Sequence, residues 1–369
     1  MKIFVLGTRG IPQIPGGVET HCEQLYPLIA KQGHQVLLSR RSAYVGVHLR
    51  EFNGVELVDI FSPKSKSLEA IVHSFLSVIK ARTWGADIVH VHAIGPSLVI
   101  PFARLLGLKV VMTNHGPDYD RQKWSKLAKL VLQLGEYLGG KFANSVIVIS
   151  EHIKAIVTKR CGKESQLIFN GVQIPEKNDD NSFLRKLGLD KGGYLFTAAR
   201  LVPEKGLHDL VEAFEGMNTS IKLVIAGDSD HEDAYSISLK QSVLRNSNII
   251  MPGYVKGDDL AQLYSHARMF VLPSYHEGLP IALLEALSYG LQTMVSDIPA
   301  NKAVSLDPKH YYHCGDVQDL LNSLVQQLDQ PWEQNDRNKA IDFVKAKYNW
   351  REIASQTIMV YENTISEQN

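Results

Sequence analysis

The sequence predicts an α/β protein built from two doubly wound domains of similar size. Short apolar, β-branched runs alternate with helical periodicity along the first half of the chain, and the same alternation starts again near residue 193. Strand, helix and strand in this rhythm indicate parallel βαβ units. The 369 residues suit two domains of about 150 to 200 residues. We therefore expect two parallel sheets, each with helices on both faces.

The first half begins with a buried strand, followed by a helix over residues 18–33 with apolar side chains along one stripe. Pro27 lies inside this helix and is expected to kink it, since proline lacks the backbone N–H and clashes with the preceding turn. Two further helices are predicted at about 67–83 and 96–106. The strands are predicted at 2–7, 34–39, 55–60, 87–92, 109–116 and 145–150.

A polar segment with a proline, residues 170–182, separates the halves and is the expected linker. The second half repeats the plan, with helices predicted at about 206–216, after Asp258 and after Pro280. Its strands are predicted at 193–199, 221–227, 248–255, 268–274 and 292–297. Sheets of this type bind ligands at the carboxyl ends of their strands, so a cleft where two such domains face each other is the expected site.

The composition is that of a globular protein, with 44% hydrophobic and 21% charged residues. Cys22, Cys161 and Cys314 are scattered, with no CxxC and no neighbouring pair of histidines, so we expect reduced thiols and no structural metal. No run approaches the roughly 18 apolar residues of a membrane span, and the first apolar stretch is too short for a signal peptide. We expect a cytoplasmic protein.

The loop after the first strand, residues 7–20, contains neither GxGxxG nor GK[ST], which excludes the dinucleotide and ATP fingerprints. Gly16 and Gly17 nevertheless lie where the helix begins. A ligand can approach bare backbone amides and the positive end of the helix dipole there. A flexible strand-to-helix turn is the alternative interpretation.

The corresponding loop of the second half, "ARLVPEKG" at 199–206, carries two cations. Arg200 offers a planar fork and Lys205 a compact ammonium, on either side of a turn containing Pro203. Both can converge on one diphosphate. The alternative is a helix-capping turn with two solvated cations.

The segment "SYHEGLPIALLEALSYG", residues 274–290, places two carboxylates eight positions apart. Pro280 suits the first turn of a helix, which leaves Glu277 in the loop ahead of it. Glu285 then lies some 8 Å along the axis, at about 1.5 Å per residue. That spacing suits the distance from the sugar and phosphate end of a nucleotide sugar to its ribose hydroxyls. For each glutamate alone, an acidic residue that supports the helix start is the alternative.

With these motifs the sequence resembles the family 4 glycosyltransferases of the GT-B fold, which have two Rossmann-like domains facing each other across a cleft. The resemblance covers nearly the whole chain. It rests on "GGVE" in the first loop, "NHG" at 114–116, "NGV" at 170–172, "ARLVPEKG", "PGYV" and PSxxEGxPxxxLEA. Many members have EGFGLP where this chain has a single glycine before the proline, which leaves the contacts to the sugar open. The opening "TRGIPQIPGGVET" is similar to a bacterial subgroup that acts in surface-polysaccharide assembly and includes rhamnosyltransferases.

The resemblance implies transfer of a sugar, with retention at the anomeric carbon, from a nucleotide-diphosphate sugar to a glycan or lipid-linked saccharide in bacterial surface-polysaccharide synthesis. It also implies that no metal or other cofactor is needed. Residues 1–171 would form an acceptor-binding domain and 172–349 a nucleotide-sugar-binding domain, with a helix over 350–369 returning to the first. Breaking the glycosyl phosphate bond requires stabilisation of the charge on the leaving diphosphate, which fixed cations and amides can supply.

The resemblance further assigns roles to individual residues. Arg200 and Lys205 would neutralise the diphosphate, with the amides of Gly16 and Gly17 assisting. His115 and Glu277 would contact the donor sugar, and Glu285 the ribose. The implied catalytic residues are His115, Arg200, Lys205 and Glu277; the implied donor-binding residues are Gly16, Gly17, Asn170, Tyr254, Val255, Gly278, Leu279 and Glu285; and Glu19 is the implied acceptor-binding residue.

Two patterns resemble metal sites. "DSD" at 228–230 resembles the metal-binding DxD of the other glycosyltransferase fold, but it directly follows a predicted strand, and we interpret it as an ordinary turn. His90 and His92 alternate on one strand without a third ligand at useful spacing, which favours hydrogen-bonded histidines over a metal pair.

The segment 121–142 predicts an amphipathic helix with lysines beside its apolar stripe. A helix packed into the core is one interpretation, and peripheral contact with a membrane surface that presents a lipid-linked acceptor is the other. The halves of the neutral chain differ in charge: residues 1–170 hold 21 Lys and Arg against 12 Asp and Glu, or +9, and the remainder 18 against 27, or −9. The basic first half favours a surface facing anions, with drift between domains as the alternative.

Two other functions fit the same motifs. A GT-B nucleotide-sugar epimerase would release an altered sugar without an acceptor, so incubation with donor alone distinguishes it. A binding subunit without catalysis is the second alternative. The presence of all four residues of the cation and carboxylate sets, Arg200, Lys205, Glu277 and Glu285, counts against it.

Overall fold

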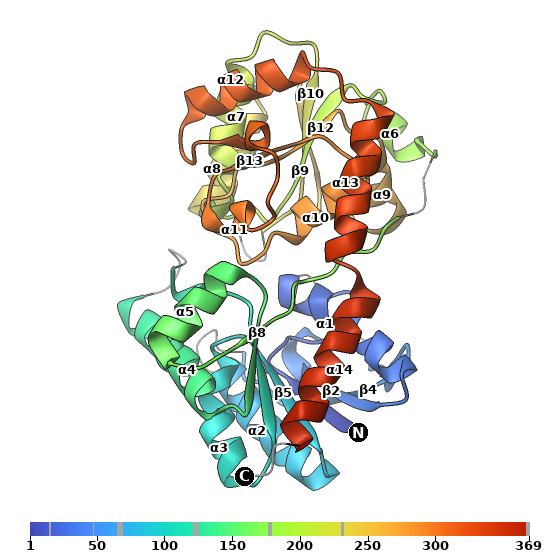
Figure 1. The fold of residues 1–369 in the computed structure, drawn as a ribbon. Coiled ribbons are helices and arrows are strands. Elements are labelled where there is room, and N and C mark those ends of the chain that lie inside the picture. The colour runs from blue at the N-terminus through green and yellow to red at the C-terminus, as the bar shows by residue number, and fades with distance from the viewer. Residues whose placement is uncertain are drawn as a thin grey trace. The chain divides into compact units, whose positions relative to one another are not determined.

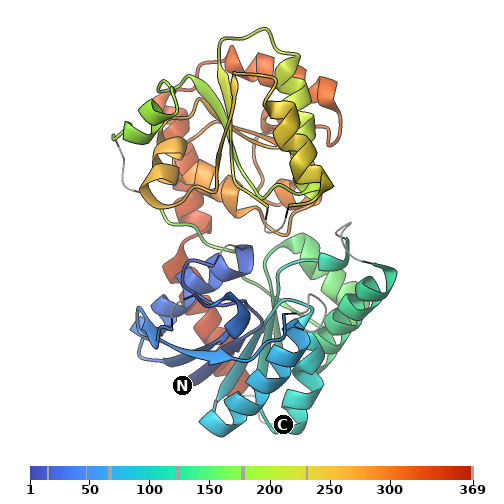
Figure 2. The same ribbon diagram turned by 180° about the vertical axis from the view of Figure 1, so that it is seen from behind.

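The computed structural model describes residues 1–14, 16–46, 48–64, 69–120, 125–175, 179–229 and 232–366. It divides into two compact units (Figures 1 and 2). The first unit comprises Met1–Gly171 together with Tyr348–Asn369, and the second comprises Val172–Lys347. Among the described residues, no helix combines the length and the apolar character needed to cross a bilayer.

The first unit is built on an eight-stranded sheet with the order β3-β4-β2-β1-β5-β6-β7-β8. Neighbouring strands are parallel apart from β3 against β4. The central strands are buried on both faces, which explains why they read as continuous apolar runs. The strands are β1 (Lys2–Leu6), β2 (Gln35–Arg41), β3 (Glu51–Phe52), β4 (Val55–Ile60), β5 (Ile88–His92), β6 (Val110–Asn114), β7 (Ser145–Val148) and β8 (Gln166–Leu167).

Helices cover both faces of this sheet (Figures 1 and 2). The first helix runs through Pro27 to Lys31. Where the sequence predicts one helix near 96–106, a 3-10 turn precedes a short α-helix. The helical elements are α1 (Gly17–Lys31), η1 (Ser42–Tyr44), α2 (Glu69–Trp84), η2 (Pro96–Val99), α3 (Ile100–Leu105), η3 (Asp118–Asp120), α4 (Lys126–Phe142), α5 (Glu151–Cys161) and α14 (Trp350–Ser366).

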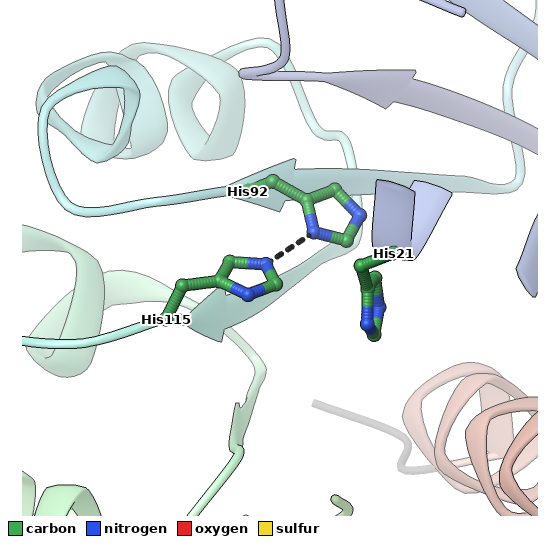
Figure 3. Close-up of side chains that lie close together, drawn as sticks. All are labelled: His21, His92 and His115. Carbon is green, nitrogen blue, oxygen red and sulfur yellow. Dashed lines mark hydrogen bonds between the residues drawn. The ribbon is translucent and has the colours of Figure 1, made fainter. Parts of the chain in front are cut away.

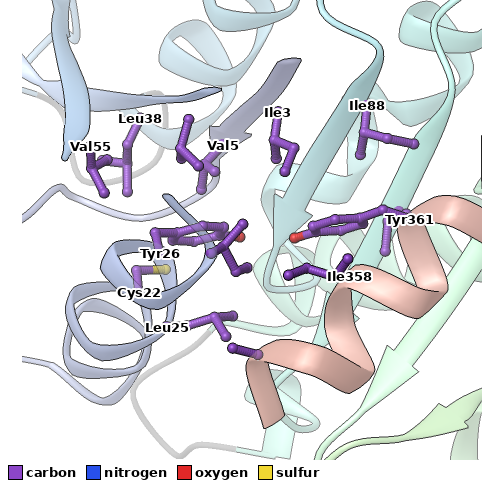
Figure 4. Close-up of a cluster of buried hydrophobic side chains, with 14 of the residues drawn as sticks. Ile3, Val5, Cys22, Leu25, Tyr26, Leu38, Val55, Ile88, Ile358 and Tyr361 are labelled. Atoms are coloured by element: carbon purple, nitrogen blue, oxygen red, sulfur yellow. The ribbon is translucent and has the colours of Figure 1, made fainter. Parts of the chain in front are cut away.

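The terminal helix α14 belongs to the core of the first unit. It packs beside α1, and both helices cover the same face of the sheet (Figure 4). Ile358 and Tyr361 of α14 are buried with Leu25 and Tyr26 of α1 and with Ile3 of β1. Burying such a side chain contributes roughly 1.5 to 3 kcal/mol, so the last helix is an integral part of this unit.

The second unit has a six-stranded parallel sheet with the order β11-β10-β9-β12-β13-β14. Its strands are β9 (Tyr194–Ala198), β10 (Lys222–Ala226), β11 (Ile249–Gly253), β12 (Met269–Leu272), β13 (Thr293–Ser296) and β14 (Tyr311–Tyr312). Its helical elements are α6 (Ser182–Lys186), η4 (Pro203–Lys205), α7 (Leu207–Glu215), α8 (Ala234–Val243), α9 (Gly257–His266), α10 (Ile281–Ser288), α11 (Pro299–Lys302), η5 (Pro308–His310), α12 (Val317–Leu328) and α13 (Gln334–Lys347).

Each sheet has a point at which the strand order reverses. In the first unit this point lies between β1 and β5, and in the second between β9 and β12. Loops that leave adjacent strands here diverge to opposite faces and open a crevice at the carboxyl edge, where doubly wound sheets bind ligands. Both phosphate-loop candidates from the sequence follow a strand at a reversal point: residues 7–16 follow β1, and residues 199–205 follow β9.

Candidate functional site

The second unit brings a lysine and a glutamate into contact at the reversal point of its sheet. Lys205 ends the turn η4 after β9, and Glu277 lies in the loop after the adjacent strand β12. The Lys205 Nζ and Glu277 Oε1 atoms are 2.5 Å apart, with the side chains 18% and 11% exposed. The Ser274 hydroxyl donates a second hydrogen bond to the same carboxylate oxygen, at 2.8 Å.

Close backbone packing holds these two loops together. Gly206 has φ 62°, and a Cβ atom there would lie 2.0 Å from the carbonyl oxygen of Pro273. Only glycine fits both the left-handed conformation and this approach. The Tyr275 N–H donates to the carbonyl of Glu204 at 2.9 Å. The glycine that closes "ARLVPEKG" thus positions Lys205 beside the loop that carries Glu277.

The electrostatics of the pair favour ionised Glu277. Burial opposes the charged form, but the Lys205 ammonium and the hydrogen bonds from Lys205 and Ser274 hold the pKa of Glu277 below its ordinary value. The positive charge of Lys205 is therefore balanced by the Glu277 carboxylate, and a bound anion can take the place of that carboxylate. An ammonium at a reversal point with an exchangeable partner can stabilise a phosphate or diphosphate.

Glu285 is the fifth residue of α10, whose N-cap is Pro280. Its Oε2 atom accepts a hydrogen bond from the Tyr264 hydroxyl at 3.0 Å, and the Tyr264 ring stacks on Tyr289 with centroids 5.2 Å apart. Burial raises the pKa of Glu285 to about 7, against the opposing effect of the Tyr264 hydrogen bond. The buried site therefore disfavours the charged form of this carboxyl group.

The remaining predicted residues of the second unit lie on loops at the same edge of the sheet. Arg200 is half-buried on the loop after β9, and Gly278 and Leu279 link Glu277 to α10, with Leu279 buried. Tyr254 and Val255 follow β11, which is separated from β12 by two strands. Tyr254 is 56% exposed. Direct contact thus joins Lys205 to Glu277, whereas the other residues share the edge.

In the first unit, Glu19 anchors the loop before α1. It is buried and accepts hydrogen bonds from the Arg9 backbone N–H at 2.9 Å and from the Thr8 hydroxyl at 3.3 Å. The Arg9 guanidinium pairs with it at 3.2 Å. A Cβ atom on Gly16, which has φ 146°, would lie 2.1 Å from Glu19 Oε2. Gly16 is the N-cap of α1 and, followed by Gly17, supplies no side-chain acceptor to the first amides of the helix.

Three histidines meet at the carboxyl edge of the first sheet (Figure 3). His92 ends β5, His115 follows β6, and His21 lies on α1. The His92 Nδ1 and His115 Nε2 atoms are 2.9 Å apart, and one nitrogen from each of the three rings lies within 4.8 Å of the others. Asn170, a predicted donor-binding residue, places its Oδ1 atom 2.8 Å from His21 Nδ1.

Burial keeps these imidazoles neutral. It lowers the pKa of His21 to about 4. Burial, and then the neighbouring histidines, lower the pKa of His92 and His115 well below the ordinary value. Sequence reasoning identified His115 and weighed His92, but missed His21, which lies one helical turn after the glycine pair and facing the sheet.

His90 forms the next layer of this cluster. Its Nε2 atom is 2.7 Å from the Thr113 hydroxyl, and its Nδ1 atom lies 2.9 Å from the Tyr26 hydroxyl and 2.6 Å from that of Tyr361. The Tyr26 hydroxyl is also 2.5 Å from His92 Nε2. The interpretation of His90 as a hydrogen-bonded histidine is confirmed. For His92, however, the fold brings two further histidines close, His21 and His115, which the sequence around His92 does not reveal.

The loop that carries His115 is fastened to a buried acid that sequence reasoning missed. Glu136 of α4 accepts hydrogen bonds from Asn114 Nδ2 and from the Tyr119 hydroxyl, both at 3.1 Å. Arg160 of α5 pairs with it at 2.8 Å. Burial raises the pKa of Glu136 despite these partners. Glu136 therefore ties the residues on both sides of His115 to the helical layer.

The DxD-like segment begins with Asp228, which pairs with Lys240 of α8 at 3.0 Å and accepts a hydrogen bond from the Ser229 N–H at 2.8 Å. The second aspartate, Asp230, lies outside the described residues. The described part of the segment is a loop that the ion pair with Lys240 ties to the following helix.

Comparisons with known proteins agree for both halves of the chain. Residues 15–174 match the family described as Glycosyltransferase Family 4, and residues 179–347 match Glycosyl transferases group 1. The chain is 25% identical to an uncharacterized glycosyltransferase of Methanocaldococcus jannaschii over 98% of each protein. It is 28% identical to the UDP-Gal:alpha-D-GlcNAc-diphosphoundecaprenol alpha-1,3-galactosyltransferase of Escherichia coli, covering 69% of this chain and 71% of the relative. Sucrose-phosphate synthase of Thermosynechococcus elongatus has the same fold, with a TM-score of 0.84 and 19% identity over the full length of both chains.

Proposed function

We propose that this chain, which belongs to the glycosyltransferases and has the GT-B fold, is a retaining, metal-independent enzyme of bacterial surface-polysaccharide synthesis. It moves a sugar from a nucleotide-diphosphate donor to a glycan or lipid-linked saccharide. The donor is assigned to the second unit and the acceptor to the first.

The observation that carries the proposal is the contact between Lys205 and Glu277 at the reversal point of the second sheet. Departure of a nucleoside diphosphate places negative charge on its oxygens, and a fixed ammonium stabilises that charge more in the transition state than in the bound donor. The diphosphate replaces Glu277 as the partner of Lys205, which frees the carboxylate for the hydroxyl groups of the sugar. Arg200, on the same loop, provides a second positive charge for the diphosphate.

The other residues complete the proposed assignment. Ionised Glu285 accepts hydrogen bonds from the ribose, and the backbone near Tyr254 and Val255 holds the base. Neutral His115 contacts the donor sugar as a hydrogen-bonding group, because burial keeps it uncharged. Glu277 is assigned to sugar binding and not to nucleophilic attack: in our proposal the acceptor attacks from the face the diphosphate leaves, and the leaving oxygen takes its proton, in contrast to the double displacement of retaining glycosidases.

The relatives support the substrate class. The matched galactosyltransferase of Escherichia coli is named for a UDP-sugar donor and a diphosphoundecaprenol-linked acceptor. The similarity of "TRGIPQIPGGVET" to a subgroup that includes rhamnosyltransferases makes a deoxyhexose donor one member of the panel to test. A lipid-linked acceptor also requires the enzyme to work at a membrane surface.

An exposed apolar face on α4 supports such a contact. The helix buries its glycines, with Gly135 against the Ile94 carbonyl and Gly139 against Met112, and turns three of its five leucines outward. Leu127 is 72% and Leu130 is 62% exposed. The interpretation of this stripe as core-packed is wrong at three positions. The exposed apolar residues of α4 are Leu127, Leu130, Leu134, Tyr137 and Phe142.

Lysines flank this face, as in helices that lie on anionic lipid. Lys126 is exposed at the start of α4, whereas Lys123 and Trp124 of the predicted stripe lie outside the described residues. Replacing Leu127 and Leu130 by serine should abolish sedimentation with anionic vesicles at low salt, with little effect on stability because both are exposed. Leu244, which is 85% exposed in the second unit, provides the control: its serine variant should sediment like the wild type. Equal sedimentation of all three proteins would refute the contact.

Acceptor-dependent release of nucleoside diphosphate tests the function. The wild type, given a panel of UDP-, GDP- and dTDP-sugars with a diphosphoundecaprenol-linked saccharide, should form product only when both substrates are present. The product should keep the anomeric configuration of the donor, as measured by NMR. Conversion of the donor without any acceptor would identify an epimerase, and full activity of the Glu277→Ala variant would contradict the assigned site.

A further inference from the structure

The three-histidine cluster of the first unit has the dimensions of a metal site. Zinc bound by imidazole has Zn–N bonds of about 2.0 to 2.1 Å, which places tetrahedral ligand nitrogens roughly 3.3 Å apart. The His92 and His115 nitrogens are already 2.9 Å apart, and a nitrogen of His21 completes a set in which every separation is within 4.8 Å. The three rings lie side by side at this edge of the sheet (Figure 3).

Two of the rings already have a hydrogen-bonding partner on the nitrogen that would not bind the metal, as metal-bound histidines commonly do. A ligating imidazole commonly donates its other N–H to a fixed oxygen, which sets its orientation and tautomer. His21 Nδ1 faces the amide oxygen of Asn170 at 2.8 Å, so its Nε2 atom carries the lone pair. His92 Nε2 faces the Tyr26 hydroxyl at 2.5 Å. When that nitrogen donates to Tyr26, His92 Nδ1 is the ligand, and Tyr26 in turn donates to His90.

The surroundings suit a borderline divalent ion. The three rings come from α1, β5 and the loop after β6, so sheet and helix packing holds them in place. His21 and His92 are buried, whereas His115 is half-buried. Neutral imidazole nitrogens favour Zn²⁺ and related first-row ions over Mg²⁺ and Ca²⁺, which prefer oxygen.

We infer that His21, His92 and His115 form a binding site for Zn²⁺, and that occupation of this site inhibits sugar transfer. Three protein ligands leave the fourth tetrahedral position for water or an anion. In this proposal the donor sugar contacts His115 through the same nitrogen that binds zinc, Nε2, so the two cannot bind at once. Metal binding stands on the cluster alone, whereas the inhibition also rests on the role proposed for His115.

Zinc affinity can be measured by competition with a chromophoric chelator, on the full-length protein stripped of metal. The wild type should bind a single Zn²⁺ ion, and His21→Gln and His92→Gln should each weaken binding by at least 100-fold. Tyr26→Phe, which removes only the outer partner of His92, should weaken it by about 10- to 100-fold. His152→Gln is the matched control, because His152 is an exposed histidine of the same unit, and it should bind like the wild type.

X-ray absorption at the zinc edge tests the ligand set without any substitution of a buried residue. The wild-type spectrum should contain imidazole scattering from three rings, with Zn–N distances of about 2.0 to 2.1 Å. Binding that is unchanged in both the His21→Gln and His92→Gln variants, or a spectrum without imidazole, would overturn the proposed site and leave the transferase assignment intact.

Transfer activity measured against free zinc tests the inhibition. The wild type and His152→Gln should lose activity as the site fills, and His21→Gln should require at least tenfold more zinc for half-inhibition, whatever its own rate. Full activity of the zinc-loaded wild type would refute the inhibition and the assigned contact of His115 with the donor, while the binding data would still establish the metal site.

Discussion

Replacing Glu285 by glutamine should make the second unit more stable while weakening donor binding. In the folded protein the pKa of Glu285 is raised to about 7 from 4.5 because the carboxyl group is buried. Above pH 7 the folded protein therefore carries a carboxylate in a site that disfavours its charge. Glutamine removes the charge and keeps an oxygen that can accept the hydrogen bond from Tyr264.

The size of the effect follows from the two pKa values. A difference of 2.5 between 7 and 4.5 corresponds to about 3 kcal/mol at 1.36 kcal/mol per unit. The folded state binds more protons than the unfolded state between these values, so this contribution favours folding below pH 4.5, declines as pH rises, and is lost above pH 7. Glu285→Gln should therefore gain about 2 to 3 kcal/mol at pH 8 and less than about 1 kcal/mol at pH 5.

Differential scanning calorimetry at the two pH values provides the measurement. For a unit of the size of residues 172–347, each kcal/mol shifts the midpoint by about 2 to 4 °C, so the transition of the second unit should rise by about 4 to 12 °C at pH 8. The same variant should bind nucleoside diphosphates and their sugars more weakly, a loss of function that accompanies the gain in stability. An equal shift at pH 5 and pH 8, or a lower midpoint at pH 8, would show that the pKa of Glu285 is not raised in the folded protein.

Two further predictions concern the stability of the same unit, and a third concerns transfer activity. Lys205→Met leaves Glu277 buried without its cation and should lower the free energy of unfolding by about 3 kcal/mol, as measured by calorimetry. Adding Glu277→Gln should restore most of that loss. A double variant as unstable as the single one would argue against a coupled pair. Gly206→Ala, which drives a Cβ atom to 2.0 Å from the Pro273 carbonyl oxygen, should lower the unfolding midpoint far more than Gly192→Ala, where φ is also positive but no atom lies within 4 Å. Transfer activity should survive treatment with EDTA, and complete loss that Mg²⁺ or Mn²⁺ restores would contradict metal independence.

The architecture and the loops that carry Lys205 and Glu277 were accessible from the sequence because their signals are local, whereas the direct contact between the two side chains was not predicted. Parallel sheets buried on both faces give apolar runs that stand out along the chain. Lys205 and Glu277 each lie in a short motif next to a strand, and adjacent parallel strands bring the ends of those motifs together.

The histidine cluster was not accessible in this way, because its members are separated by up to 94 positions in the chain. His21 gives no local signal beyond its place on α1, and Glu136 reads as one polar residue on an amphipathic helix. The leucine stripe of α4 misled for a physical reason. Periodicity locates an apolar face but does not reveal whether the glycine face opposite packs more closely, as Gly135 and Gly139 do.

Hydrogen–deuterium exchange with and without donor tests whether the donor binds at the reversal point of the second sheet. A nucleoside diphosphate sugar that raises the thermal midpoint of the protein identifies a ligand of the folded state, and exchange then locates it. This ligand should slow exchange in residues 199–206 and 274–285, the segments that carry Lys205, Glu277 and Glu285. A ligand that binds without protecting either segment would contradict the placement of the donor at the reversal point of the second sheet.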